Sequence, residues 1–508
     1  MSAKSLIVMG TASDAGKSVV VTALCRAFLR AGIRVAPFKA QNMSNNAAVC
    51  TGGEIGRAQA AQAEACGLEP TVDMNPVLLK PDSESGCQVV IGGRARFHMN
   101  AMEHDRYRAQ AWPEIMNSYQ RMARDFDLIV IEGAGGAAEI NLRHRDLVNW
   151  AVAEMTGAPV VIVGDIDKGG VFASLFGTVE LLSPSDRARV KGFIINKFRG
   201  DPRLLQDGLQ MLEQRTGLPV LGVLPYLHGL RIPQEDGAVL DATTRLPAAR
   251  RDLSAGVVRF PRISNYTDFA PLEDEPDVAV HYLSDPAQAP ELDVLMLPGS
   301  KNTVADLRWL RQAGWENYLA RHLRRGGWVV GICGGYQMLG RRIVDRHGVE
   351  SQVPEVTGLG LLEVETCFET GKVTARVSAS HLASGLALSG YEIHAGRVLR
   401  DGGVRALLRI TEREGAAVGE LEGAQSEDGR VLGTSVHGLF DSAGLRRHFL
   451  DAVRAAKGLN PHTEGLGEDF RAVRERAYDL IADAAAEHLD LRRLLALAAD
   501  RPAPAPTP

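Results

Sequence analysis

The sequence predicts an α/β protein, with a doubly wound, mostly parallel first domain and a second α/β domain after it. Two observations support this fold class. Short runs rich in Val and Ile, bounded by glycine or proline, alternate with helix-length segments, which is typical of parallel strands covered on both faces. In addition, the chain has 508 residues. That length is too great for one hydrophobic core, so we expect two or three domains.

The first domain is predicted to span residues 1–235, with the strand-like runs SLIVMG, RVAPFKA, FDLIVIEGAGG, PVVIVGDID, VKGFIINKF and LPVLGVLP. Residues 236–252 lose this pattern and are interpreted as a linker. A second series of strands follows at 253–442, including DVLMLPGSKNT, GGWVVGICGG and VLGTSVHGLFD. Residues 443–500 have helical patterns, which we expect to pack against the second domain. The tail 501–508, RPAPAPTP, is too rich in proline to fold and is predicted to be disordered.

Composition excludes several classes of function. The formal net charge of −5 argues against nucleic acid as the main partner, so the expected partners are small molecules. No run of about 18 apolar residues indicates a membrane span. The opening MSAKSLIVMG leads directly into a glycine loop and does not read as a signal peptide, so we expect a cytoplasmic protein. The six cysteines form no CxxC pair and show no metal-ligand spacing.

A glycine-rich turn after the first strand, GTASDAGKS, has the residues of a phosphate-binding P-loop. Gly10 and Gly16 allow backbone N–H groups to point at phosphate oxygens. Lys17 can bridge the terminal phosphates of ATP, and the Ser18 hydroxyl can bind Mg²⁺. Five residues separate the two glycines, where the usual pattern has four. The other loop positions assigned to the nucleotide are Thr11, Ser13 and Asp14.

Carboxylates follow two further strands of the first domain. Glu132 is predicted to end the strand in IVIEGAGG, and Asp165 and Asp167 end the strand in VGDID. A carboxylate at a strand end beside a phosphate loop is well placed to hold Mg²⁺, directly or through water. Ser18, Glu132 and Asp165 are therefore the candidate metal ligands. The alternative for Glu132 is an ordinary charge at a helix N-terminus.

The run GICGGYQMLG in the second domain predicts a nucleophile elbow. Gly331 and Gly335 permit a sharp turn between a strand and a helix, and a helix N-terminus lowers the pKa of a thiol such as Cys333. His437 could be the general base if its strand lies beside the elbow strand; the alternative is a hydrogen-bonded histidine at a strand end. The turn LPGSKNT, residues 297–303, is interpreted either as an oxyanion hole or as a structural turn.

Each domain resembles a known group of enzymes. The longer loop, together with PFKAQN and its Lys39, resembles dethiobiotin synthetase and its relatives, P-loop enzymes that phosphorylate a carboxylate and then amidate or cyclise it. The second domain resembles the class I glutamine amidotransferases, in which a cysteine thiolate releases ammonia from glutamine. The glutamate that usually stands two residues after the histidine is missing, because Gly438 and Leu439 follow His437. This leaves a Cys–His dyad or an orienting group from elsewhere, for which Glu392 is a candidate.

The order of motifs from about residue 5 to 442 resembles the cobyric acid synthase family. The motifs are GTASDAGKS, KAQNMSNN, GEIGRAQA, DMNPVLLKP, GDIDKGGVFASL, NKFRGD, PGSKNT, GICGGYQMLG, YEIHAGR and SVHGLFD. The resemblance implies amidation of the b, d, e and g carboxylates of a corrinoid, adenosylcobyrinic acid a,c-diamide, in cobalamin biosynthesis, with L-glutamine, ATP and Mg²⁺. It also implies that Lys39 stabilises charge on the transferred phosphoryl group and that Asn196 contacts adenine.

Two other functions compete with this interpretation. Cobyrinic acid a,c-diamide synthase shares both domains, and the run KAQNMSNN argues against it. A ParA-like nucleotide switch with an inactive glutaminase domain belongs to a different class of protein. Such a switch typically carries a second lysine early in its phosphate loop, whereas positions 11–15 here are TASDA.

Overall fold

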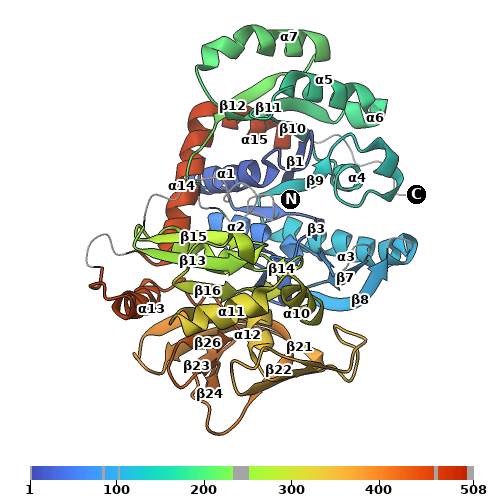
Figure 1. Ribbon diagram of the computed structural model, residues 1–508. Coiled ribbons are helices and arrows are strands. Elements are labelled where there is room, and N and C mark those ends of the chain that lie inside the picture. Colours follow the sequence, from blue (N-terminus) through green and yellow to red (C-terminus); the bar gives the residue numbers. More distant parts are fainter. Residues whose placement is uncertain are drawn as a thin grey trace.

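The computed structural model describes residues 3–82, 86–100, 103–230, 232, 251–462 and 467–499. Apart from residues 251 and 252, the predicted linker lies outside the described residues, as does the tail 501–508. Figure 1 shows two α/β bodies, the first domain mainly in the upper part of the view and the second domain in the lower part, with the C-terminal helices α13 and α14 along the left side.

The centre of the first domain is a six-stranded parallel sheet that contains all six predicted strand runs. Its strand order is β12-β11-β10-β1-β9-β2. The strands are β1 (Lys4–Gly10), β2 (Val35–Phe38), β9 (Leu128–Gly136), β10 (Val160–Asp165), β11 (Val190–Phe198) and β12 (Val220–Pro225). The helices that belong with this sheet are α1 (Lys17–Arg30), η2 (Ile140–Arg145), α4 (Trp150–Thr156), α5 (Val171–Leu181), α6 (Pro184–Arg187), η3 (Pro202–Leu205) and α7 (Gln206–Thr216).

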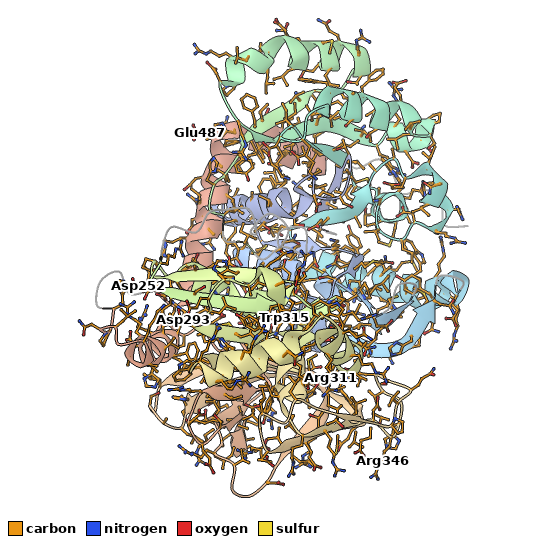
Figure 2. The ribbon with its side chains drawn as sticks, in the orientation of Figure 1. Asp252, Asp293, Arg311, Trp315, Arg346 and Glu487 are labelled. Carbon is orange, nitrogen blue, oxygen red and sulfur yellow. The ribbon has the colours of Figure 1, made fainter. Side chains whose placement is uncertain are left out.

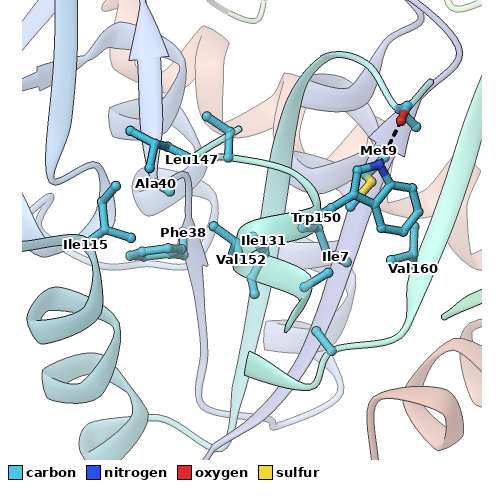
Figure 3. Packing of buried hydrophobic residues seen from close by; sticks show 14 of the residues in the cluster. Ile7, Met9, Phe38, Ala40, Ile115, Ile131, Leu147, Trp150, Val152 and Val160 are labelled. Atoms are coloured by element: carbon cyan, nitrogen blue, oxygen red, sulfur yellow. Dashed lines mark hydrogen bonds between the residues drawn. The ribbon is translucent and has the colours of Figure 1, made fainter. Parts of the chain in front are cut away.

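Strand β1 explains why the predicted strands are apolar throughout. Ile7 and Met9 belong to the core on one face of the sheet, which Figure 3 shows together with Phe38 and Trp150. Leu6 and Val8 belong to a separate core on the opposite face. A strand that is buried on both faces needs apolar side chains at consecutive positions. Within the first core, the Trp150 indole donates a hydrogen bond to the Ala137 carbonyl at 2.7 Å.

Residues 41–125 form an insertion between β2 and β9 that the predicted strands did not include. It contains a four-stranded sheet of order β3-β6-β7-β8 and a separate β4–β5 hairpin. The elements are β3 (Gln41–Met43), β4 (Ala47–Cys50), β5 (Gly53–Gly56), α2 (Arg57–Ala65), η1 (Val72–Met74), β6 (Val77–Pro81), β7 (Gly86–Ile91), β8 (Arg94–Asn100) and α3 (His104–Asp125). Strands β4 and β5 contact strand β21 of the second domain, and β4 also contacts β22.

The second domain contains a six-stranded sheet of order β15-β13-β16-β18-β26-β25, parallel except for β25. The domain also contains a second sheet of order β20-β19-β21-β22-β27. Strand β23 joins this sheet by pairing with β21, and β24 pairs with β23. The strands are β13 (Leu253–Val258), β14 (Ile263–Ser264), β15 (Val278–Leu283), β16 (Val294–Leu297), β17 (Gly299–Ser300), β18 (Trp328–Ile332), β19 (Arg342–Val344), β20 (Glu355–Thr357), β21 (Val364–His381), β22 (Ala387–Arg400), β23 (Leu408–Arg413), β24 (Ala416–Glu422), β25 (Ala424–Gln425), β26 (Val431–Thr434) and β27 (Val436–His437). The helices are η4 (Tyr266–Phe269), α9 (Ala270–Glu273), η5 (Pro286–Gln288), α10 (Thr303–Gln312), α11 (Trp315–Arg324) and α12 (Gly334–Leu339).

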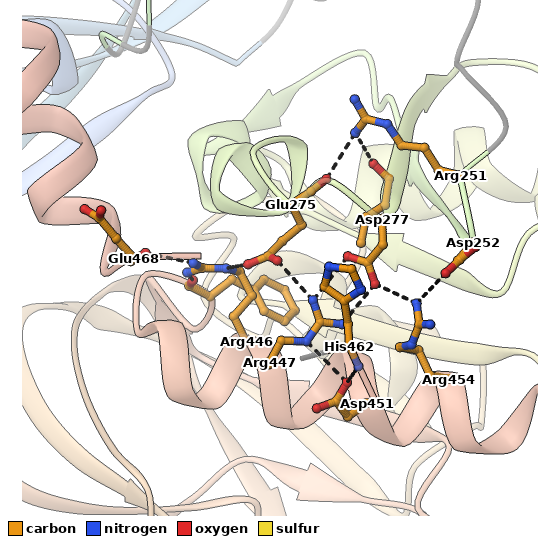
Figure 4. Close-up of polar contacts among 12 residues, drawn as sticks. Arg251, Asp252, Glu275, Asp277, Arg446, Arg447, Asp451, Arg454, His462 and Glu468 are labelled. Atoms are coloured by element: carbon orange, nitrogen blue, oxygen red, sulfur yellow. Dashed lines mark hydrogen bonds and ion pairs between the residues drawn. The ribbon is translucent and has the colours of Figure 1, made fainter. Parts of the chain in front are cut away.

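Helix α13 (Ala443–Ala456) packs against the second domain through a network of buried arginines. Arg446 pairs with Glu275 at 2.6 Å, and Arg447 and Arg454 pair with Asp277 at 3.1 and 2.8 Å (Figure 4). Each carboxylate faces two guanidinium groups or a guanidinium fork, which compensates for its loss of water. This helix therefore lies where the sequence analysis expected the C-terminal helices to lie.

The expectation was wrong for α14 (Phe470–His488) and α15 (Leu491–Ala499), which pack on the first domain. Tyr478 and Ile481 of α14 and Leu494 of α15 share a core cluster with α1 and β1. Arg26 of α1 also pairs with Asp479 at 2.9 Å. Figures 1 and 2 show α14, with Glu487 near one end, running up beside the first domain. Within the described ranges, no helix is long and apolar enough to cross a membrane.

Candidate active sites

The phosphate loop joins β1 to α1 with its lysine held against the loop. Gly16 has φ 91° and directly precedes α1, and a Cβ atom there would lie 2.0 Å from the Asn196 amide nitrogen. The position therefore requires glycine for two reasons, the positive φ and the close approach. Lys17 Nζ donates to the carbonyls of Ala12 and Gly135, each at 3.0 Å. This places the ammonium group at the loop, where terminal phosphates would bind.

Glu132 is the centre of a buried polar cluster beside the loop. Its Oε1 accepts hydrogen bonds from the Ser18 hydroxyl and from Lys39 Nζ, both at 2.9 Å, and its Oε2 accepts one from Gln62. The side chain is 1% exposed. Burial, the largest single effect, raises the pKa of Glu132, but the charge of Lys39 and the hydrogen bonds to the carboxylate together hold the pKa below its ordinary value. The carboxylate is therefore ionised at neutral pH.

Two expectations about Glu132 are corrected by its surroundings. Strand β9 does not end there but continues to Gly136, with a shift in its register against β1 just after Glu132. A β-bulge of this kind re-aims side chains near active sites. The residue is also not a charge at a helix N-terminus. Gln62, on α2 of the insertion, completes the cluster and was not predicted, because α2 carries no motif of a phosphate site.

Asp165 has a different partner from the other two metal candidates. It ends β10 as predicted, and its Oδ2 pairs with Lys197 Nζ at 2.7 Å. Lys197 in turn donates to the Asp14 carbonyl of the loop at 2.8 Å. The structure thus brings Ser18 and Glu132 together and pairs Asp165 with a lysine. The described residues contain no group of three or more His, Cys, Asp or Glu side chains arranged to hold a metal ion.

Asn196 braces the phosphate loop from the end of β11. Its amide donates to the Ala15 carbonyl at 3.1 Å, and the residue is 5% exposed. The exposed loop residues Ser13 and Asp14 lie just before Ala15. Asn196 therefore lies against the phosphate loop, and its predicted contact with adenine stays a prediction.

Cys333 occupies a strained turn between β18 and α12, as the elbow motif predicts. Its φ of 51° and ψ of −109° are unusual for a residue with a side chain. A Cβ atom at Gly335 would lie 1.9 Å from the Leu297 carbonyl, and one at Gly331 would lie 2.8 Å from the backbone of Gly335. Only glycine fits at these two positions, so the sequence around Cys333 is fixed by the turn.

His437 reaches Cys333 because their strands are neighbours. Strand β26 pairs in parallel with β18, with Thr434 opposite Ile332, and His437 follows in β27. Burial alone would raise the pKa of Cys333, but the hydrogen bond and charge of His437 hold it below its ordinary value. Burial would lower the pKa of His437, but Asp268 and Cys333 raise it to about 10. These shifts favour the thiolate of Cys333 and the imidazolium of His437.

Asp268 is the third member of this centre, and the sequence analysis missed it. It lies on η4, its Oδ2 is 2.7 Å from His437 Nδ1, and its Oδ1 accepts the Gly438 N–H at 3.1 Å. Glu392 is the wrong candidate for this position: its carboxylate pairs with Arg413 at 3.0 Å. The short segment SNYTDF around Asp268 carries no spacing typical of a catalytic triad, so no local signal could have identified it.

The turn at residues 297–303 lies against the elbow. The Gly335 N–H donates to the Pro298 carbonyl at 3.0 Å. A Cβ atom at Gly334 would lie 2.8 Å from the Ser300 backbone nitrogen. The turn is therefore close enough to the Cys333 elbow to supply backbone N–H donors there, as one of the two interpretations requires.

Two centres of this kind in one chain define a class of protein, and comparisons with known proteins agree with it. A family model described as the CobQ/CobB/MinD/ParA nucleotide binding domain matches residues 6–239. Another, described as the CobB/CobQ-like glutamine amidotransferase domain, matches residues 254–445. The chain is thus an ATP-dependent ligase with a glutamine amidotransferase domain.

Full-length relatives narrow this class to one family. Cobyric acid synthase from Sorangium cellulosum is 50% identical, covering 96% of this chain and 98% of its own length. Cobyric acid synthase from Syntrophobacter fumaroxidans is 46% identical, covering 97% and 98%, and that from Photorhabdus laumondii is 48% identical, covering 96% and 97%. The chain belongs to the cobyric acid synthase family. Neither the a,c-diamide synthase nor the ParA-like switch is favoured.

Proposed function

We propose that this chain converts adenosylcobyrinic acid a,c-diamide to adenosylcobyric acid in cobalamin biosynthesis. It would amidate the b, d, e and g side-chain carboxylates, with ATP as energy source and L-glutamine as nitrogen source. The observation that carries the proposal is the presence, in one chain of this family, of a charged phosphate-loop site and a Cys–His–Asp site. A cytoplasmic location is part of the proposal, since ATP and glutamine are cytoplasmic metabolites.

The first site has the groups needed to activate a carboxylate. A carboxylate oxygen attacks the γ-phosphorus of ATP, ADP leaves, and the product is an acyl phosphate that ammonia can attack with release of phosphate. Lys17 and Lys39 are proposed to compensate the charge that develops on the transferred group, which is supported by the position of Lys17 at the loop and of Lys39 beside Glu132. Ser18 and Glu132 supply a hydroxyl and an ionised carboxylate, the hard oxygen ligands that Mg²⁺ prefers, and they would hold it. The ion would neutralise phosphate charge.

The nucleotide itself would be held by the loop. Its backbone and the exposed side chains of Ser13 and Asp14, together with Thr11, are proposed to face the phosphates. Asn196 is proposed to contact the adenine while its amide stays bonded to the loop carbonyl of Ala15. This assignment is supported by the position of Asn196 at the carboxyl end of β11, the edge of a parallel sheet where ligands bind.

The second site has the groups needed to release ammonia from glutamine. The Cys333 thiolate attacks the side-chain amide carbon, and the His437 imidazolium protonates the departing nitrogen. Water then attacks the thioester, gives a proton to His437, and the C–S bond breaks to release glutamate. Asp268 holds the imidazole through Nδ1, so that Nε2 faces the reacting atoms.

Mass spectrometry of the corrinoid tests both halves together. Purified protein is incubated with adenosylcobyrinic acid a,c-diamide and Mg-ATP, with either glutamine or ammonium chloride, and Cys333→Ser is run alongside. We expect four successive losses of about one mass unit as O–H becomes N–H₂, with the variant active only on ammonia. Should neither nitrogen source change the corrinoid mass, the proposed acceptor is wrong.

A further inference from the structure

One residue of the second domain connects its catalytic centre to the first domain. Asn265 lies just before η4, is 3% exposed, and adopts a left-handed conformation with φ 50° and ψ 38°. Its Oδ1 accepts a hydrogen bond from the backbone N–H of Ala47 at 2.9 Å. Its Nδ2 lies 3.4 Å from Nε2 of His437. Ala47 belongs to strand β4 of the nucleotide-binding domain.

The bond to Ala47 fixes which way the amide of Asn265 points. A backbone N–H can only donate, so the atom that faces Ala47 must be the amide oxygen. The amide NH₂ group must then face His437 Nε2. Because Nδ1 of His437 is already bonded to Asp268, Nε2 is the nitrogen left for proton transfer. A donor beside Nε2 is compatible with the neutral imidazole and opposes the imidazolium.

Other contacts of β4 and its hairpin hold this arrangement together. Ala47 packs in an apolar cluster with Ile393 of the second domain, and the Ile393 carbonyl is 3.9 Å from Cys333 Sγ. The ring of Tyr391 stacks on the imidazole of His437 at a centroid distance of 5.0 Å. Arg57, from the first domain, lies 5.9 Å from the Tyr391 ring centre. The first domain therefore reaches the glutaminase centre from two sides.

A buried ion pair anchors the same hairpin. Glu54 of β5 is 1% exposed and pairs with Lys80 of its own domain at 2.7 Å and with Lys372 of the second domain. Burial alone would raise the pKa of Glu54, but the two ammonium groups lower it to about 2. The carboxylate is thus charged at any pH at which the enzyme works. The pairing with Lys372 is lost if the domains separate.

We propose that Asn265 is a positioning residue for His437, that it favours neutral imidazole during thioester hydrolysis, and that strand β4 sets its orientation. The inference rests on the proposed glutaminase function. After Cys333 is acylated, its thiolate no longer favours the imidazolium, and His437 must accept a proton from the attacking water. The other charged and titratable groups that face His437 are Asp268, which favours the imidazolium, and Tyr391. Glutamine is therefore hydrolysed at full rate only while the domains are docked.

The sharpest test compares Asn265→Asp with Asn265→Ala. Aspartate keeps an acceptor for Ala47 but replaces the donor beside His437 with an acceptor. We expect the glutaminase kcat to fall about 10–100-fold in Asn265→Asp and about 3–10-fold in Asn265→Ala. In Asn265→Asp the acid limb of kcat should move to higher pH, because a carboxylate raises the pKa of His437. The KM for glutamine and the ammonium-dependent amidation should be unchanged.

A purely structural role predicts otherwise, since Asn265→Asp would then keep both its kcat and its pH profile. That result would overturn the proposal. Wild type and Cys333→Ser are measured alongside to separate the two levels of inference. Glutamine hydrolysis that is absent in wild type contradicts the proposed function, whereas a wild-type rate that persists in Asn265→Asp contradicts only the role of Asn265.

The contribution of strand β4 is tested with Ala47→Pro. Proline has no backbone N–H, so this variant loses the hydrogen bond that Asn265 Oδ1 accepts from residue 47. We expect Ala47→Pro to slow glutaminase about 3–10-fold in the wild-type background and to have no further effect in Asn265→Ala. Arg376→Gln is the control, because it breaks an exposed ion pair with Glu69 at the same domain interface. Additive effects would overturn the coupling. If Ala47→Pro loses ammonium-dependent amidation and so has not folded, the pH profile of Asn265→Asp decides.

Discussion

The two catalytic centres differ in how their charged groups are controlled. Glu132 is kept ionised by a neighbouring cation, Lys39, and also accepts hydrogen bonds from Ser18 and Gln62 beside the phosphate loop. Cys333 and His437 instead shift each other's pKa: His437 lowers that of Cys333, while Cys333 and Asp268, on the other side of the imidazole, raise that of His437. At the first centre a neighbouring lysine keeps the carboxylate charged. At the second centre the nucleophile and its histidine influence each other's protonation.

This difference has a consequence for the order of events. The first centre is polar and can rest without reacting until ATP and its acceptor arrive. At the second centre the pKa shifts favour a reactive thiolate, and the protonation state of His437 affects the rate of glutamine hydrolysis. If Asn265 acts as proposed, its bond with Ala47 links glutamine hydrolysis to docking of the nucleotide-binding domain, because Ala47 belongs to that domain. Variants at either centre test this difference.

The largest effect is expected at the second centre, from Asp268→Asn. The glutaminase kcat should fall about 10²–10⁴-fold, because the imidazole loses the group that orients it. Asp268 raises the pKa of His437, so in the variant the imidazolium should lose its proton at a lower pH. The alkaline limb of the kcat/KM profile should therefore shift to lower pH. Steady-state kinetics between pH 6 and pH 10 would measure this. Glu392→Gln is the control, and a large effect there with none at Asp268 would reverse our assignment.

Lys17→Met should produce the opposite pattern at the first centre. Amidation should fall about 10²–10³-fold with glutamine and with ammonium alike, because charge on the transferred phosphoryl group is no longer compensated. Glutamine hydrolysis should persist. Lys191→Met is a matched control, since Lys191 lies at the far end of β11 and donates to the Ala188 carbonyl. Amidation that survives with ammonium would show that Lys17 does not act on ATP.

Glu132→Gln should weaken metal binding by the first centre alone. The variant keeps a side chain of the same shape but loses the negative charge beside Ser18. We expect the Mg²⁺ concentration for half-maximal amidation to rise about 10–100-fold, with glutaminase unchanged. Titration of Mg²⁺ at saturating ATP measures this concentration. Glu154→Gln is the control, because Glu154 is an exposed carboxylate that pairs with Arg143. An unchanged Mg²⁺ requirement would remove Glu132 from the metal site.

The smallest effect is expected where α14 meets the first domain. Arg30 and Asp483 are 49% and 63% exposed, so Arg30→Gln should change the free energy of unfolding by about 0–1 kcal/mol. Arg26 is 15% exposed and meets two carboxylates of α14, so Arg26→Gln should cost about 1.5–3 kcal/mol. Denaturant unfolding followed by circular dichroism compares them. Equal effects would mean that burial does not govern these pairs.

The sequence by itself determined the features that are local. Strands buried on both faces, such as β1 with Ile7 and Leu6 in different cores, carry runs of consecutive apolar residues, and this made the parallel sheet predictable. The phosphate loop and the elbow were predictable because close backbone approach and sharp turns demand glycine, as at Gly16 and Gly335. The motif order pointed to the family.

Only the tertiary structure decided which distant side chains meet. Asp268 and Asn265 lie about 170 positions before His437 in the chain and reach it because β14 and η4 fold back onto the strand ends. Gln62 reaches Glu132 from an inserted helix, and α14 crosses from the second domain to the first. Contacts at such separation leave no periodic or spacing signal, because each residue satisfies only its spatial neighbours. The sequence therefore identified Cys333, whereas Asp268 and Asn265 were identified only from the tertiary structure.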